Sequence, residues 1–447
     1  MARSILSRDL AAIAARLRTA NTRLAAAYPG DPIGRQPVHT LICSGDAFTR
    51  DSAQTFGAAA VAALNEFGPT ASSFAKTIGL ASDDATLIEA VRARVMAKLK
   101  REPVEDLRLD FEDGYGTRPD AEEDGHAESA AREIAAGMSA GTLPPFIGIR
   151  IKPMSRELHA RSLRTLDLFV TALVKTGKRL PDHFAITVPK VMTPTHVDAV
   201  DRACTALERR LKLKRNSLRL ELMIETPQSI LAPDGTSALR ALVAAGAGRV
   251  RGAHLGVYDY TALAGITASW QHPRHLACDF ARHMMQVALA QTGVVIVDGS
   301  SNLMPIPPHG PQPGRPLTDA QQRENLAVIQ RAWKTHFADI THSLVNGYYQ
   351  GWDLHPAQLP TRYAAVYAFY LSARPAATAR LKKFFDKAAR AGAVFDDAAT
   401  GQALVNFFTR AWSSAAITRE ELMETGLAPP DLEGRSFLQI LANRSGG

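Results

Sequence analysis

The chain of 447 residues is long enough for one large domain with a substantial core, or for two domains. Apolar residues make up 46% and charged residues 21%, which excludes fibrous, low-complexity and largely disordered proteins. The net charge of +8 comes from scattered basic residues with only short clusters such as 209–215, so it favours anionic small molecules and predicts no nucleic-acid partner.

The cysteines and the first residues indicate where the protein works. Cys43, Cys204 and Cys278 lie far apart, with neither a metal-binding spacing nor a disulfide framework, which indicates a reducing compartment. Residues 4–28 carry charges among regularly spaced apolar residues, so they predict an amphipathic helix and not a signal peptide. No apolar run reaches the length of a membrane span. We expect a cytoplasmic protein without a membrane partner.

Short apolar runs with branched residues recur along the chain and predict strands that alternate with helices. The expected strands are 38–43, 107–111, 146–151, 184–188, 218–225, 250–260, 294–298 and 348–355, and the first expected helices are 51–64, 83–100 and 127–136. Polar residues at successive strand ends lie 34 to 40 residues apart, a spacing that fits one strand, one helix and two loops. These residues are Glu112, Arg150, Lys190, Glu225, Asp259 and Asp298. This pattern predicts an α/β fold, and the strand count favours a (β/α)8 TIM barrel over an open sheet.

The chain is divided into an N-terminal helical segment (1–36), a barrel catalytic domain (37–359) and a C-terminal helical extension (360–447). Helices are expected in the extension at 363–371, 376–391 and 400–413, followed by a poorly ordered tail from residue 429. The acidic stretch 115–125 is expected to be a loop. A Pro-rich loop, 304–317, is expected on the face of the polar strand ends, as a lid or an oligomer contact.

Two carboxylates mark the ends of neighbouring predicted strands. Glu225 precedes a Thr-Pro that no strand interior would tolerate, and Asp259 takes an equivalent place in the next strand. Barrels hold their ligands at these carboxyl ends. Two carboxylates suit a hard cation such as Mg²⁺, which keeps several waters and accepts substrate oxygens. The alternative is that each carboxylate caps the following helix.

Other polar residues at strand ends also have a functional and a structural interpretation. The forked guanidinium of Arg150 suits a substrate carboxylate or a developing enolate oxygen, or else it pairs with Asp110 or Glu112. These two acids share one side of their strand, so one of them would orient Arg150 or a metal-bound water. Lys190 would be an electrostatic group, a Schiff-base lysine or a structural residue. His355 is interpreted as structural in preference to a general base.

Six short motifs follow one another at 109–113, 148–151, 188–191, 224–226, 256–260 and 347–358. In this order they resemble the citrate lyase beta-subunit and metal-dependent 2-oxo acid aldolase family, within the phosphoenolpyruvate/pyruvate barrel superfamily. The resemblance implies that Glu225 and Asp259 bind Mg²⁺, with Mn²⁺ as the alternative metal. It also implies that Arg150 binds the substrate carboxylate and stabilises an enolate.

The implied enzyme is a Mg²⁺-dependent carbon–carbon lyase or aldolase that acts on a 2-oxo acid or hydroxy acid through a metal-bound enolate, in a homo-oligomer. Catalytic roles are also assigned to Glu112 and Lys190, and a substrate contact to Pro227. One alternative is an acyl-CoA-dependent malyl-CoA lyase or malate-synthase-like condensing enzyme. Relatives often have a lysine after the acidic motif for acyl-CoA, where this chain has the longer, acidic stretch 114–126. A second alternative is a catalytically silent barrel that serves as a binding subunit.

Overall fold

Eight parallel strands form the centre of the molecule. The computed structural model describes residues 5–31, 34–311, 315–391, 398–433 and 436–445. The strands are β1 (His39–Ser44), β2 (Asp106–Asp110), β3 (Phe146–Arg150), β4 (Phe184–Val188), β5 (Arg219–Ile224), β6 (Val250–Leu255), β7 (Val295–Val297) and β8 (Gly351–Asp353). Their order in the sheet is β7-β6-β5-β4-β3-β2-β1-β8. A parallel bridge from Asp298 to Gly351 brings the two edges together, so the sheet is a nearly closed barrel and the predicted TIM-barrel class is confirmed.

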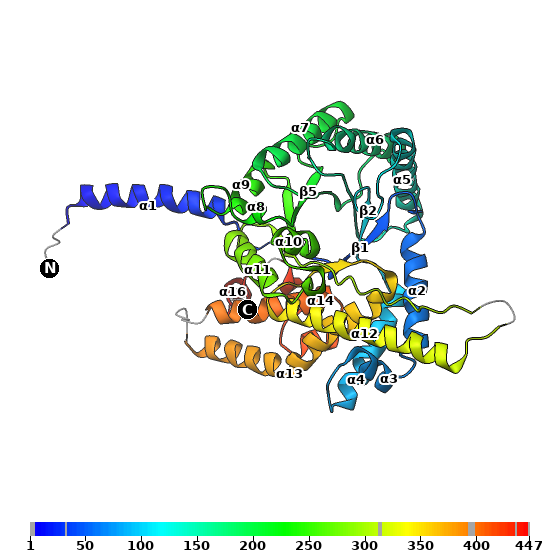
Figure 1. Cartoon of the computed structure of the whole chain (residues 1–447). Helices are drawn as coiled ribbons and strands as arrows, with labels where there is room; N and C mark the ends of the chain where they lie inside the picture. Colours follow the sequence, from blue (N-terminus) through cyan, green and yellow to red (C-terminus); the bar gives the residue numbers. More distant parts are fainter. Residues whose placement is uncertain (1–4, 32–33, 312–314, 392–397, 434–435, 446–447) are drawn as a thin grey trace.

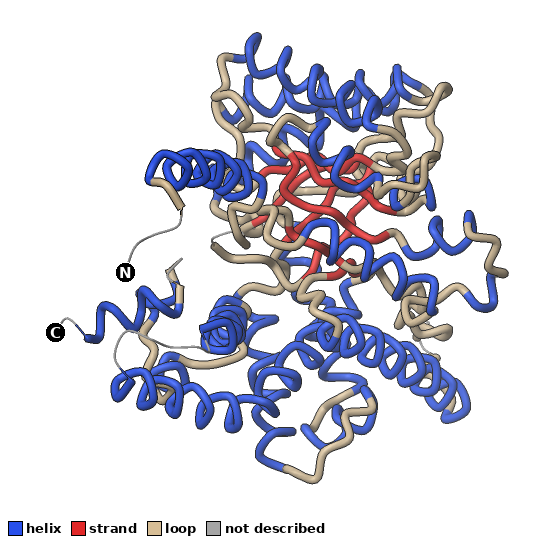
Figure 2. The backbone as a smooth tube through the Cα atoms, turned by 90° about the vertical axis from the view of Figure 1, so that its left-hand side faces the viewer, coloured by secondary structure: helices blue, strands red, loops and turns tan. Residues whose placement is uncertain are grey.

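Helices surround the strands (Figure 2). The strands are buried on both sides because these helices cover the outside of the barrel and buried side chains such as Arg108 and Glu221 fill its interior. β2, β3 and β4 are buried at all five of their positions. Their register aligns the last residue of β2, Asp110, with Ser44 of β1 and with Arg150 of β3. Polar residues that end neighbouring strands therefore meet at one edge of the barrel.

The helices that follow the strands form the outer layer (Figure 1). They are α2 (Ser52–Phe67), α3 (Ala71–Ile78), α4 (Ala85–Arg101), α5 (Asp120–Ala140), α6 (His159–Gly177), α7 (Pro194–Leu211), α8 (Pro227–Ile230), α9 (Ala238–Ala245), α10 (Val257–Leu263), α11 (Leu276–Leu289) and α12 (Asp319–Val345). The expected loop at 115–125 is wrong from Asp120 onward, because α5 begins there with three acidic residues in its first turn. Acidic residues stabilise a helix at that end.

The Pro-rich segment leaves the barrel after β7, at the carboxyl ends of the strands. Residues 304–311 lie outside helices and strands, as expected, and 312–314 lie outside the described residues. A role for this segment as a lid or an oligomer contact stays a prediction.

The chain after β8 is helical, with α13 (Leu359–Ala391), α14 (Ala398–Ser413), α15 (Arg419–Met423) and α16 (Phe437–Ser445). The prediction of separate helices at 363–371 and 376–391 is wrong, because α13 continues through Pro375. A proline removes one helical hydrogen bond, and the fully buried Tyr363 and Tyr367 show that packing holds α13 in place. The poorly ordered tail is also wrong for the described residues, since Phe437 and Ile440 of α16 are buried.

Helix α1 (Ser7–Ala27) is the predicted amphipathic helix, and it projects away from the barrel in Figure 1. None of its residues is buried. Its apolar residues Leu10, Ile13, Leu17 and Leu24 are all exposed. No helix in the described part of the chain combines the length and the apolar composition that crossing a lipid bilayer requires.

Candidate active site

The ends of β2 and β3 join a carboxylate and a guanidinium. Asp110 accepts hydrogen bonds from Nε and Nη2 of Arg150 at 2.7 and 2.8 Å. It also accepts the backbone N–H groups of Glu112 and Gly114 at 3.0 and 2.7 Å, which fixes the turn after β2. A Cβ atom on Gly114 would lie 2.6 Å from Asp110 Oδ2, so this turn requires glycine. The ion pair expected as an alternative for Arg150 is therefore present.

Arg150 keeps donors for a ligand beyond this pair. A guanidinium has five N–H groups, and Asp110 takes one from Nε and one from Nη2. The Nη1 atom lies 3.2 Å from Glu112 Oε2. The guanidinium also lies over the ring of Trp352, 5.8 Å from its centroid. The arginine side chain is only 10% exposed, so its position is fixed before any ligand arrives.

Lys190 places its ammonium among three carboxylates. It contacts Glu112, lies 3.0 Å from Asp113 Oδ2 and lies 3.3 Å from Asp259 Oδ2. Burial lowers the pKa of Lys190, but the carboxylates, Glu112 foremost, outweigh it and raise the pKa above its ordinary value. A Schiff base needs a neutral amine, so this geometry favours the electrostatic interpretation of Lys190.

Glu225 follows directly on β5 and is 3% exposed. Its Oε1 accepts the backbone N–H of Lys190 at 2.6 Å. Burial, together with repulsion from Asp259 and Glu112, raises the pKa of Glu225 to about 8. The chain packs tightly on this side chain, since a Cβ atom on Gly256 would lie 2.3 Å from Glu225 Oε2.

Asp259 reaches the cluster from a helix and not from a strand end. β6 ends at Leu255, so the prediction of a strand over 250–260 is wrong beyond that residue. The chain turns into α10, whose first turn contains Asp259. A carboxylate is favoured there by the helix dipole, in line with the helix-start alternative, yet the side chain also faces Lys190. With 38% of its side chain exposed, Asp259 is accessible to a ligand.

Two further predicted residues begin helical turns next to this cluster. Pro227 is the first residue of α8, after Thr226, which caps the helix. It lies two residues from Glu225, and its contact with a substrate stays a prediction. His355 Nδ1 accepts the backbone N–H of Ala357 at 3.1 Å, so this histidine has the structural role that was preferred for it.

Trp352 is a residue of the site that the sequence did not indicate. Its indole N–H donates to His254 Nδ1 at 2.9 Å inside the barrel, and its ring supports Arg150. The alternation of side chains along β8, where Trp352 lies between Gly351 and Asp353, was the signal available for it.

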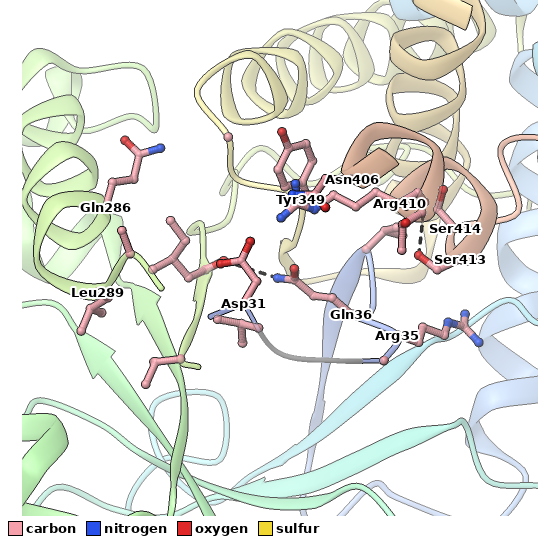
Figure 3. A pocket seen from close by; sticks show the side chains of 18 of the residues that line it. Asp31, Arg35, Gln36, Gln286, Leu289, Tyr349, Asn406, Arg410, Ser413 and Ser414 are labelled. Atoms are coloured by element: carbon pink, nitrogen blue, oxygen red, sulfur yellow. Dashed lines mark hydrogen bonds between the residues drawn. The ribbon is translucent and has the colours of Figure 1, made fainter. Parts of the chain in front are cut away.

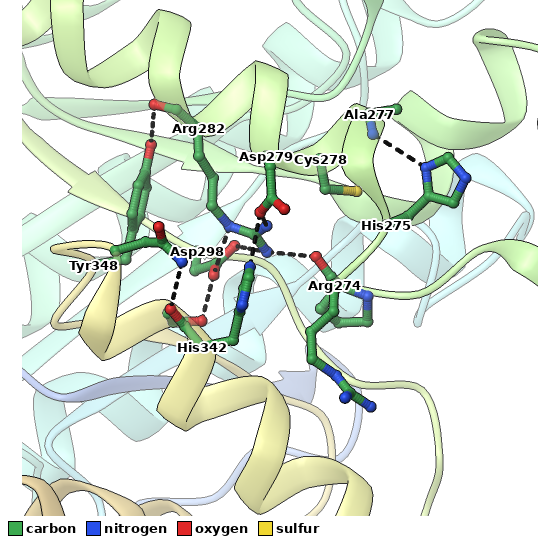
Figure 4. Close-up of polar contacts among 12 residues, drawn as sticks. Arg274, His275, Ala277, Cys278, Asp279, Arg282, Asp298, His342 and Tyr348 are labelled. Carbon is green, nitrogen blue, oxygen red and sulfur yellow. Dashed lines mark hydrogen bonds and ion pairs between the residues drawn. The ribbon is translucent and has the colours of Figure 1, made fainter.

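Asp298 shows that a strand-end carboxylate can be purely structural. It is one of the regularly spaced residues, but it pairs with Nε and Nη2 of Arg282 at 3.0 Å each and accepts the Ser343 hydroxyl (Figure 4). This buried contact ties α11 and α12 to the end of β7. Regular spacing therefore marks strand ends and does not by itself mark the site.

The donor set of the cluster fits Mg²⁺. The cluster holds five carboxylates and two cations: Asp110, Glu112, Asp113, Glu225 and Asp259 with Arg150 and Lys190. This excess of carboxylates and the raised pKa of Glu225 leave room for another positive charge. Within the described ranges, no group of three or more His, Cys, Asp or Glu side chains is placed so that it could hold a metal ion, so the protein would supply at most two ligands. Mg²⁺ commonly takes one or two carboxylates and fills its other positions with water or substrate oxygens.

Comparisons with known proteins leave the chemistry open. No curated protein sequence matches this chain. Among solved structures, the Haloferax volcanii malate synthase lead(II) complex is similar, with 16% identity, a TM-score of 0.45, and coverage of 87% of this chain and 94% of that chain. The CitE protein from Mycobacterium tuberculosis in complex with magnesium and acetate is also similar, with 16% identity, a TM-score of 0.38, and coverage of 74% and 91%.

Neither likeness says what this chain binds, because both TM-scores are below 0.5 and both identities are low. A sequence family described as a domain of unknown function, DUF6986, matches residues 17–440. This match spans nearly the whole chain. The protein therefore belongs to the DUF6986 family.

Proposed function

We propose that this protein is a Mg²⁺-dependent enzyme that forms or cleaves a carbon–carbon bond of a 2-oxo acid or hydroxy acid. The proposal rests on one observation: a fixed arginine stands beside a surplus of carboxylates, one of which has a pKa raised to about 8. An acidic site of this kind attracts a divalent cation, and the arginine attracts an anionic substrate. The six motifs that resemble the citrate lyase beta-subunit and aldolase family agree with this chemistry.

Glu225 and Asp259 are the residues that would hold Mg²⁺, which supplies positive charge next to the substrate oxygens. Asp259 is exposed enough to meet a cation that enters from solvent, whereas Glu225 is buried. Ionised Glu225 is costly without a positive partner, as its raised pKa indicates. In this proposal the exposed Asp259 contacts the incoming cation first, and the buried Glu225 then binds it as the second protein ligand.

Arg150 would bind the substrate carboxylate. Asp110 holds the guanidinium in a fixed orientation, and the N–H groups that Asp110 does not use can donate to a carboxylate or to a carbonyl oxygen. Cleavage of the bond between the carbons α and β to the carbonyl leaves its electron pair on that oxygen as an enolate, while the β-hydroxyl gives its proton to a base and becomes the carbonyl of the second product. A fixed positive group near the oxygen lowers the barrier because it needs no reorganisation during the reaction.

Lys190 is proposed to act electrostatically rather than to bond covalently. Its ammonium contacts Glu112 and Asp113 after β2 and Asp259 in α10, so it neutralises part of the acidic cluster. The acyl-CoA enzyme stays the alternative. Asp120, Glu122 and Glu123 at the start of α5 do not argue against it, because each is paired with a basic side chain: Arg161, Arg118 and Lys152 in turn.

The experiment that tests this function follows the exchange of pyruvate and 2-oxobutyrate C3 protons with D₂O by proton NMR. Exchange at C3 reports enolate formation and needs no knowledge of the second substrate. We expect exchange that requires Mg²⁺, that stops when a chelator is added, and that falls by about 100-fold or more in Asp259→Asn. Asp198→Asn, which removes a carboxylate from an exposed surface pair, is the matched control. Equal exchange in all three proteins, or exchange without Mg²⁺, would contradict the proposal.

A further inference from the structure

A cavity of about 390 Å³ lies at the amino ends of the strands, the end of the barrel opposite the acidic cluster. Figure 3 shows the side chains that line it. Its walls come from the residues that precede β1, from the C-terminal end of α11, from the chain that enters β7 and β8, and from α13 and α14. All the strand residues involved are at amino ends, whereas the acidic cluster is at carboxyl ends. The size is within the range of pockets that hold small organic ligands.

One wall of the cavity carries a cation that no anion neutralises. The guanidinium of Arg410 lies 4.0 Å from the centroid of the Tyr349 ring. In the part of the chain that the structure describes, no carboxylate pairs with this guanidinium. Arg35, which also lines the cavity, differs because it pairs with Glu102 and Glu105 at 2.7 Å each. Figure 3 shows the guanidinium of Arg35 directed away from Arg410 and Tyr349.

A second donor lies on the same wall. Asn406 is one helical turn before Arg410 in α14, so both side chains leave the same side of the helix. The Asn406 Oδ1 atom accepts the amide of Gln402 at 2.9 Å, which leaves the Nδ2 amide of Asn406 to donate into the cavity. A guanidinium with an amide beside it is a combination that recognises a carboxylate.

The other residues that line the cavity indicate what kind of body and what total charge the ligand has. Leu289, Val294, Val366 and Tyr370 are buried and present apolar surface to the cavity. At the rim stands Asp31, an exposed carboxylate, which disfavours a ligand with a second negative charge. The lining therefore suits a monoanion with an apolar body better than a phosphate dianion.

We propose that this cavity is a second binding site, separate from the acidic cluster, for a small organic monocarboxylate with an apolar body. Its carboxylate binds Arg410 and Asn406, and its apolar body lies against the buried side chains of the opposite wall. Because the lining joins the barrel to α14, the bound ligand links the helices after β8 to the amino-terminal face of the barrel.

The test is calorimetric titration with 4-bromobenzoate in the absence of Mg²⁺, followed by a crystal soak in which anomalous scattering locates the bromine. We expect one site, with affinity lowered by about tenfold or more in Arg410→Ala. Arg132→Ala, which removes an exposed arginine from the surface of α5, is the control and should bind as the wild type does. If Arg410→Ala fails to fold, Asn406→Ala tests the same wall and should weaken binding.

Titration with phenyl phosphate tests whether the cavity prefers a monoanion to a dianion. Phenyl phosphate should bind more weakly than 4-bromobenzoate near neutral pH. A bromine peak between α14 and β7, with the carboxylate on Arg410, is the expected crystallographic result. The proposal is overturned if bromine occupies only the acidic cluster, if Arg410→Ala and Asn406→Ala both bind like the wild type, or if phenyl phosphate binds more tightly.

Discussion

A methyl group placed at Gly256 would test how tightly the chain holds Glu225. The backbone of Gly256, with φ −100° and ψ 96°, is open to alanine, so any effect of Gly256→Ala comes from contact and not from backbone strain. The new Cβ would lie 2.3 Å from Glu225 Oε2 and 2.4 Å from Glu225 Cβ, where ordinary contacts begin at 3.4 Å. The whole Glu225 residue must move by about 1 Å, and Mg²⁺ tolerates little change in ligand geometry.

We expect Gly256→Ala to lower Mg²⁺ affinity by about 10- to 100-fold and the free energy of unfolding by about 1–3 kcal/mol. Calorimetry and urea denaturation measure the two quantities. Gly125→Ala is the matched control: its Cβ meets nothing within 4 Å, so Mg²⁺ binding should stay unchanged. Wild-type Mg²⁺ affinity in Gly256→Ala, with Glu225 displaced in its crystal structure, would refute the assignment of Glu225 as a ligand.

Three other predictions follow from buried charges. Asp110→Asn leaves Arg150 without its carboxylate, so we expect the free energy of unfolding to fall by about 3–5 kcal/mol in urea denaturation. Lys190→Met removes an ammonium that competes with a metal for Asp259 and Glu112, and keeps a side chain at the same left-handed backbone position. Calorimetry should show Mg²⁺ affinity raised by about tenfold while proton exchange slows. Burial lowers the pKa of His39 and of His254 to about 4 each, so both stay neutral in the folded protein while the unfolded chain takes up protons below about pH 6.5. In a Glu225→Gln variant, which removes the opposing titration of Glu225, stability should therefore fall between pH 6.5 and pH 4, on the order of 3 kcal/mol for each histidine, as urea midpoints across that range would show.

Each of these predictions has an outcome that contradicts it. Asp198→Asn is the control for Asp110→Asn, because it breaks an exposed pair and should change the free energy of unfolding by less than about 1 kcal/mol. If Asp110→Asn lost no more stability than this control, burial of the Asp110–Arg150 pair would be unimportant for stability. Weaker Mg²⁺ binding in Lys190→Met would show that the ammonium supports the metal site. A flat stability profile of the Glu225→Gln variant from pH 6.5 to 4 would show that the two histidines take up protons in the folded state.

The barrel could be predicted because each strand repeats the same local pattern. β4 begins and ends at the predicted residues, and β3 differs by one residue, since a short apolar run between turns leaves little choice of boundary. The prediction failed at Pro375, where packing outweighed a local signal and α13 continues through the proline. It also failed at Asp120, where the acidic residues that were interpreted as a loop begin α5.

The candidate site was partly predictable for the same reason. Glu112, Lys190 and Glu225 end or follow strands, and parallel strands bring such residues to one edge. The role of Trp352 could not be predicted, because its ring contacts Arg150, about 200 residues earlier in the chain, only once the barrel has folded. The cavity around Arg410 could not be predicted from the sequence either, because its walls come from segments that lie far apart in the chain.

The central claim is that Glu225 and Asp259 hold Mg²⁺ beside an anionic substrate. The most direct measurement is calorimetric titration of Mg²⁺ in the presence of oxalate, which resembles the enolate of pyruvate, for the wild type and for a Glu225→Ala, Asp259→Ala double variant. We predict that the wild type binds Mg²⁺ and oxalate cooperatively and that the double variant does not. Identical titrations of the two proteins would contradict the claim and make both carboxylates structural.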